Sequence, residues 1–134
     1  MLINYIKSVI YSLLKFTKIL PFFNALSVMK ILEIDFGHFL SSYHLKPINN
    51  KLEAIPWFTY PSIEYLNAMD LSQKSVFEYG SGNSTIYWTK RAKYVTSVES
   101  NKNWYDYIKG LLKRTRYILE TNKQNYINSI KKNR

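Results

Sequence analysis

Residues 75–85, SVFEYGSGNST, combine two glycines one residue apart with a carboxylate just before them. The glycines, Gly80 and Gly82, follow an apolar run, and Glu78 stands two places before the first of them. A side chain at either glycine would fill space that a ligand needs or would forbid the dihedral angles of the turn. Where such a turn joins a parallel strand to a helix, the first helical amides favour negative charge. The segment therefore predicts a ligand-binding turn.

A second carboxylate, Glu99, ends the next apolar run, 19 residues after Gly80. In dinucleotide-binding folds, an acid about 20 residues past the turn accepts hydrogen bonds from ribose hydroxyls. Glu78 would repel a pyrophosphate, and Thr85 replaces the third glycine of the G-x-G-x-x-G fingerprint. No Gly-Lys-Ser/Thr follows, which excludes the phosphate loop of nucleoside triphosphatases. A ligand with a ribose, a carboxylate and positive charge fits these features, and S-adenosylmethionine has all three.

Short strands and helices alternate around these residues. Strands are predicted at residues 75–79, 93–98 and 116–120, and helices at residues 84–91, 101–113 and 123–132. This alternation predicts parallel pairing with right-handed crossovers. We expect an α/β fold, namely an incomplete Rossmann-like parallel sheet of about three strands in the order 3-2-1, preceded by N-terminal helices.

The N-terminal segment, residues 2–20, has the apolar spacing of an amphipathic helix, and Pro21 is predicted to end it. Three lysines interrupt the segment, and a lysine at the bilayer centre costs about 2.5–3.5 kcal/mol. Lys15 and Lys18 also break the apolar core that a signal peptide requires. We expect a cytoplasmic location, with the helix packed on a core or in peripheral contact with a membrane.

The segment between this helix and the first predicted strand is less regular. Residues 25–45 suggest a second helix that is broken at Gly37. Residues 46–61 contain three prolines and are predicted to be irregular, and Ser62 is predicted to cap the next helix.

The motifs resemble those of class I S-adenosylmethionine-dependent methyltransferases. FEYGSGNST is similar to motif I of that family, an acid followed by x-Gly-x-Gly, and VTSVES is similar to the acidic end of the second strand. The stretches IPWFTYPSIEYL and NKNWYDYIK resemble a bacterial subgroup, and the resemblance covers roughly residues 36–130. The sulfonium already activates the methyl group, so such a protein mainly aligns the incoming nucleophile.

The resemblance implies three groups of cofactor-binding residues. Those at the methionine end are Glu78, Gly80, Ser81 and Gly82, and the adjacent Asn83 and Ser84 are also expected to bind the cofactor. Those at the ribose and the adenine are Glu99 and Ser100. Those contributed by the segment before the first strand are Pro56, Trp57, Thr59 and Tyr60. Catalytic residues stay unassigned, and the acceptor is expected to be a small molecule or a saccharide.

The family's sheet has seven strands, in the order 3-2-1-4-5-7-6, whereas three are predicted here. The ligand cleft of such a sheet lies beside the first strand, where the strand order reverses. We therefore assign residues 1–45 to a helical extension and residues 46–134 to the N-terminal half of a Rossmann-like methyltransferase domain. We expect one wall of the cofactor pocket, an exposed strand edge, a chain truncated after the third strand, and little or no methyl transfer by the isolated chain.

Composition limits the other functions. The net charge is +10, with nine basic and two acidic residues from Lys102 onward and ten against seven before it. Such a tail suits nucleic acid or an anionic membrane, although no nucleic-acid-binding motif accompanies it and a solvated helix face is the alternative. We expect no nucleic-acid partner.

Metal and disulfide chemistry are not predicted. The chain has no cysteine, which excludes disulfides and thiolate metal sites. His38 and His44 lack the helical spacing of a metal-binding pair. A nicotinamide-dependent oxidoreductase fragment, which Glu99 also fits, and a non-enzymatic basic module that binds membrane or nucleic acid stay open as alternatives.

Overall fold

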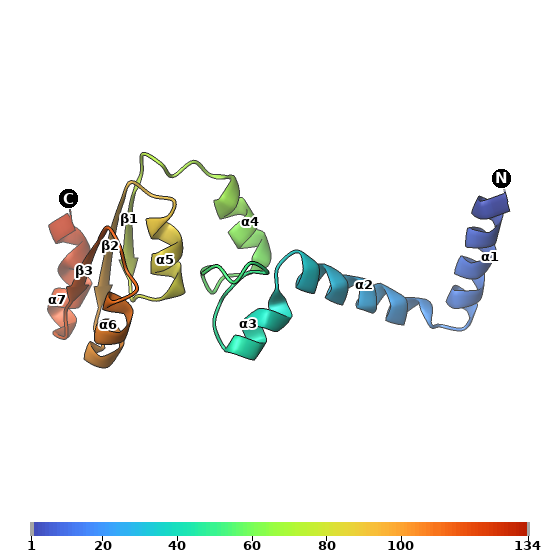
Figure 1. The fold of residues 1–134 in the computed structure, drawn as a ribbon, viewed down its shortest axis with the longest axis horizontal. Coiled ribbons are helices and arrows are strands. Elements are labelled where there is room, and N and C mark those ends of the chain that lie inside the picture. Colours follow the sequence, from blue (N-terminus) through green and yellow to red (C-terminus); the bar gives the residue numbers. More distant parts are fainter. Residues whose placement is uncertain (1, 134) are drawn as a thin grey trace.

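A computed structural model describes residues 2–133 of the chain (Figure 1). Its sheet consists of three parallel strands, β1 (Ser75–Tyr79), β2 (Tyr94–Glu99) and β3 (Thr115–Leu119), with β2 between the other two. The predicted α/β class, incomplete Rossmann-like sheet, strand order and N-terminal helices are confirmed. The predicted strand bounds differ from the observed ones by one residue at most.

β2 is the most deeply buried strand because it is paired on both sides. All residues from 95 to 99 are buried, and Val98 has no exposed surface at all. Near-continuous burial of this kind is typical of the central strand of a parallel sheet, which is covered on both faces. Ile108 on the neighbouring helix is 2% exposed and adds to the same core.

Two helices cover one face of the sheet, and a third covers the other. α5 (Asn83–Thr89) and α6 (Lys102–Lys109) lie together, whereas α7 (Lys123–Asn128), which leads into the 3₁₀ helix η1 (Ser129–Asn133), lies opposite (Figure 1). Right-handed crossovers keep successive helices on one face while strands are added in one direction. The change of face after β3 therefore means that the chain turns back over the sheet toward β1.

Tyr79 holds α7 against β1. Its hydroxyl donates to the carbonyl oxygen of Ile127 at 2.7 Å, and its ring centroid lies 5.1 Å from that of Tyr126. Successive strand residues point to opposite faces. The side chain of Tyr79 therefore lies on the face of the sheet that α7 covers, and that of Glu78 lies on the face that α5 and α6 cover.

The N-terminal half contains four helices, and here two predictions were wrong. These helices are α1 (Leu2–Phe16), α2 (Leu20–Ile34), α3 (His38–His44) and α4 (Tyr60–Ala68). Pro21 does not end a helix; it lies in the first turn of α2, where proline replaces an amide that has no helical partner. Ser62 does not cap α4 either. Thr59 does, and the hydroxyls of Thr59 and Ser62 lie 2.8 Å apart.

α1 and α2 extend away from the sheet, with the N-terminus at the far end of the molecule (Figure 1). None of the described residues in these two helices is buried. Among the described helices, none is long and apolar enough by itself to cross a bilayer. α1 and α2 meet that criterion only as a pair, with a bend of 108° between them.

Gly37 separates α2 from α3 and lies against the irregular segment that follows α3, and its predicted role as a helix breaker is confirmed. Its φ of 69° is a left-handed conformation that favours glycine, and a Cβ there would overlap the backbone of Asn49 and Asn50. The side-chain amide of Asn50 donates to the carbonyl oxygen of Ile34 at 2.6 Å. The end of α2 and the segment around Asn50 are therefore held in close contact.

We predict that Gly37→Ala destabilises the fold by about 2 kcal/mol or more, because it combines left-handed backbone strain with a backbone clash. Urea unfolding monitored by tryptophan fluorescence measures the change. Gly110→Ala is the matched control, since Gly110 has φ −68° and nothing within 4 Å of an added Cβ. That variant should be neutral or stabilising by up to about 1 kcal/mol. Equal midpoints for the two variants would contradict the prediction.

Candidate functional site

The glycine turn joins β1 to α5, as predicted, but its two glycines differ. Gly80 has φ 81°, a left-handed conformation, and a Cβ there would meet nothing within 4 Å. Gly82 is in extended backbone that any residue adopts, and a Cβ would touch only the Trp104 ring, at 4.0 Å. Only Gly80 therefore requires glycine for its backbone, while the space beside both glycines is open to a ligand.

The carboxylate of Glu99 connects the end of β2 to this turn. Its Oε2 accepts a hydrogen bond from the Ser81 hydroxyl at 2.8 Å. Its Oε1 accepts from the backbone amides of Ser100 and Asn101, each at 2.8 Å. Glu99 is 7% exposed, so these three donors stabilise a charge that is almost removed from water.

Glu78 lies on the same face of the sheet, and its hydrogen-bond partners are side chains. Its Oε2 accepts a hydrogen bond from the Thr85 hydroxyl at 2.5 Å. Burial raises the pKa of the Glu78 carboxyl above its ordinary value, and hydrogen bonds from Ser84 and Thr85 oppose that change. The structure therefore holds a half-buried acid directly beneath the first turn of α5, without a cationic side chain among the causes of its pKa shift.

Strand register explains why further polar side chains meet these acids. Glu78 pairs with Ser97, and Ser97 pairs with Tyr117, so the three lie in one row across the sheet. The Ser97 hydroxyl donates to the carbonyl oxygen of Gly80 at 2.7 Å. The Tyr117 hydroxyl lies 2.7 Å from that of Ser81, which uses its own proton on Glu99. Tyr117 therefore donates, and it extends the network from the turn to β3.

The sequence prediction did not include Ser97, Tyr117 or Trp104 in the site. Ser97 stands two places before Glu99 and therefore on the same face of the strand, which is the signal that could have identified it. Trp104 belongs to the apolar spacing of the helix predicted at residues 101–113, yet it is 43% exposed. Its indole nitrogen donates to the carbonyl oxygen of Ser81 at 2.8 Å. Periodicity identified its apolar ring but not this polar contact.

A cavity of about 270 Å³ opens beside the glycine turn. Four of the predicted residues at the turn line it, namely Ser81, Gly82, Asn83 and Ser84. Trp57 and Trp104 contribute aromatic walls. The other predicted residues of the two strand ends and the turn, Glu78, Gly80, Glu99 and Ser100, do not line it. The cavity is therefore apolar with a polar rim, the usual character of small-molecule sites.

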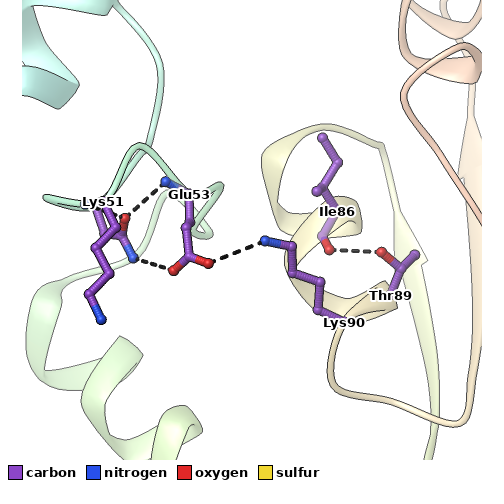
Figure 2. Close-up of polar contacts among 6 residues, drawn as sticks. Lys51, Glu53, Ile86, Thr89 and Lys90 are labelled. Carbon is purple, nitrogen blue, oxygen red and sulfur yellow. Dashed lines mark hydrogen bonds and ion pairs between the residues drawn. The ribbon is translucent and has the colours of Figure 1, made fainter.

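The segment that carries Trp57 is attached to α5 at both ends of that helix. The side-chain amide of Asn83 donates to the carbonyl oxygen of Pro47 at 2.8 Å. Figure 2 shows the second attachment, in which the Lys90 ammonium lies 3.5 Å from Oε1 of Glu53. The side-chain amide of Asn49 donates to the other oxygen of Glu53 at 3.0 Å. The ion pair is half exposed and contributes little energy, but together these contacts hold the segment next to the turn.

The predicted residues of the segment before β1, other than Trp57, do not line the 270 Å³ cavity. Pro56, Thr59 and Tyr60 line a neighbouring cavity of about 390 Å³, which Trp57 also borders. The Tyr60 hydroxyl lies 2.8 Å from Nδ1 of His38, and its ring stacks on Phe36 at 4.3 Å. Ser100 is exposed, and its amide is used by Glu99. These contacts give Tyr60 a packing role that the sequence did not indicate.

Within residues 2–133, no group of three or more His, Asp or Glu side chains could hold a metal ion. No protein-family model, no curated protein and no solved structure matches this chain. The interpretation of the site therefore rests on its own geometry.

We predict that Glu78→Gln leaves the free energy of unfolding at pH 7 unchanged or increases it. Because the pKa of Glu78 is raised in the folded protein, folding favours its protonated form. The stability that this protonation contributes is complete below about pH 4.5, the pKa in the unfolded chain. It is lost as the pH rises through the pKa in the folded protein. Urea unfolding between pH 4 and pH 8 should give a smaller decrease with pH for the variant than for the wild type. Glu64→Gln, on the exposed side of α4, is the charge-matched control. A variant that is less stable only at neutral pH would contradict this prediction.

Proposed function

We propose that the glycine turn and its two acids form the cofactor-binding half of an S-adenosylmethionine-dependent methyltransferase site. The observation that carries the proposal is the hydrogen bond from Ser81, in the turn, to Glu99, at the carboxyl end of β2. In open parallel sheets, ligands bind outside the carboxyl ends of the strands. The bond holds Glu99, the acid that we propose binds the ribose, next to the glycine turn.

Glu99 has the capacity to bind a ribose. A carboxylate offers about four acceptor positions, and Glu99 uses three of them. A ribose hydroxyl would take the fourth position or replace Ser81, whose hydroxyl keeps Tyr117 as a partner. The fourth position is the less costly of the two, because displacing Ser81 would leave one proton of the Ser81–Tyr117 hydroxyl pair without an acceptor.

Glu78 supports a cationic ligand. Its carboxyl is half buried with hydroxyl partners, so ionisation is unfavourable until a positive charge arrives. The sulfonium and ammonium groups of S-adenosylmethionine supply that charge, whereas the pyrophosphate of a nicotinamide dinucleotide would be repelled. Glu78 therefore distinguishes the proposed cofactor from the dinucleotide alternative.

The cavity between Trp57 and Trp104 would take an apolar part of the ligand. Both aromatic side chains lie beside the turn, and the Trp104 indole is fixed by its bond to the carbonyl oxygen of Ser81. Flat rings gain from stacking on aromatic side chains. The acceptor is proposed to be a small molecule or a saccharide.

We predict that S-adenosylhomocysteine binds the chain more tightly than NAD does, by at least tenfold, because it presents an ammonium group rather than a pyrophosphate. Isothermal titration calorimetry at pH 7.5 compares the two ligands. Tighter binding of NAD would favour the oxidoreductase alternative. No binding of either ligand to folded protein would refute the proposal.

We predict that Glu99→Gln weakens S-adenosylhomocysteine binding by about ten- to a hundredfold, the value of a hydrogen bond to a charged group. The amide oxygen of glutamine still accepts from the two backbone amides, so far-ultraviolet circular dichroism should be unchanged. Glu64→Gln removes the same charge on the exposed side of α4 and should leave the affinity unchanged. Equal affinities for the two variants would exclude Glu99 from the site.

A further inference from the structure

The two N-terminal helices expose large apolar side chains along their whole length. The apolar face of α1 is formed by side chains that are between 41% and 87% exposed, namely Leu2, Ile6, Val9, Leu13 and Phe16. α2 exposes further large apolar side chains, namely Phe22, Phe23, Leu26, Val28, Met29, Ile31 and Ile34. Large contiguous apolar surfaces of this kind mark interaction sites.

The two helices differ in pattern. α1 is amphipathic: its polar face carries Ser8, Ser12 and Lys15, while Tyr5 and Tyr11 fall at the two borders of the apolar face. α2 is apolar on nearly all sides, and the hydroxyl of Ser27 is satisfied by the carbonyl oxygen of Phe23 at 3.0 Å. A helix that is apolar all round belongs in a core or in lipid, and none of its described residues is buried in this protein.

The charge of this region indicates which kind of partner covers its apolar surface. Residues 1–32 contain four lysines, Lys7, Lys15, Lys18 and Lys30, and no acidic residue. The first acid, Glu33, accepts a hydrogen bond from the Phe39 amide at the junction with α3. An anionic surface complements the lysines, whereas a second copy of the same helices would bring like charges together.

We propose that α1 and α2 dock the protein on an anionic phospholipid bilayer, lying in the interface with their apolar sides in the acyl region. Each helix has 15 residues, about 22 Å in length, which is short of a hydrocarbon core about 30 Å thick. Tyrosines at the border of an apolar face suit the headgroup level. The bend of 108° lets two helices lie in one plane in different directions. This function is separate from the proposed cofactor site.

Vesicle co-sedimentation of the full chain tests the proposal. We expect binding to vesicles of 30% phosphatidylserine in phosphatidylcholine at least tenfold tighter than to phosphatidylcholine alone, and weaker binding at high salt. Val9→Asp with Leu13→Asp should abolish binding. Ser8→Asp with Ser12→Asp adds the same charge to the polar face and should weaken binding much less. Equal effects of the two pairs, or no binding by the unaltered chain, would overturn the proposal.

The absence of cysteine allows a measurement of depth. A single cysteine carrying an environment-sensitive fluorophore at Val9→Cys should brighten several-fold on vesicles, whereas one at Ser8→Cys should change little. Brightening at both positions would indicate insertion across the bilayer and overturn the interfacial orientation. A chain that ignores vesicles but forms dimers, as judged by light scattering, would assign the surface to a second copy instead.

Discussion

The carboxylate of Glu99 is the constraint on which the rest of the site depends. It is nearly buried at the end of the central strand, so its charge must be compensated locally. The Ser81 hydroxyl supplies one donor and therefore fixes the glycine turn against β2. The amides of Ser100 and Asn101 supply the others and direct the chain into α6.

The start of α6 then positions one wall of the cavity. The side-chain oxygen of Asn101 accepts a hydrogen bond from the Trp104 amide at 3.0 Å and so caps the helix. Trp104 is thereby placed with its indole nitrogen on the carbonyl oxygen of Ser81. One buried acid thus determines the turn, the helix start and the aromatic wall together.

The two acids differ in how their charge is compensated. Glu99 has two backbone amides and a hydroxyl, all directed at it by the chain itself. Glu78 has only side-chain partners, and its carboxyl keeps a raised pKa. A protein that needed Glu78 only for stability would do better with a neutral residue there. The incomplete compensation is understandable if a cation from outside completes it.

The sequence predicted the α/β half well because its signals are local. The strand β2 is a run of buried residues, and the acid that ends it, Glu99, marks the edge of the sheet. The errors at Pro21 and Ser62 have a different origin. Both residues suit the first turn of a helix as well as its boundary, so only the neighbouring chain decides between the two.

Residues of the candidate site could be predicted where their spacing in the sequence brings them together. They could not be predicted where contact depends on pairing between strands. Glu78, Gly80 and Glu99 are visible from their spacing alone. Tyr117 joins them only through the register that aligns it with Ser97, and a strand's register depends on partners far along the chain. Tyr60 was predicted to lie near the cofactor. Its contacts with Phe36 and His38 depend on tertiary packing, which the sequence alone does not show.

The arrangement in space separates the two proposed functions. The polar network lies at the carboxyl ends of the strands, whereas α1 and α2 reach away from the sheet (Figure 1). α3, the irregular segment after it and α4 lie between the two regions, and Asn50 ties that segment to the end of α2 (Figure 1). Substitutions on the apolar face of α1 therefore touch no group that contacts Glu78 or Glu99. Substitutions that remove the proposed lipid binding should leave the proposed cofactor site intact, because no described hydrogen bond connects the two regions directly.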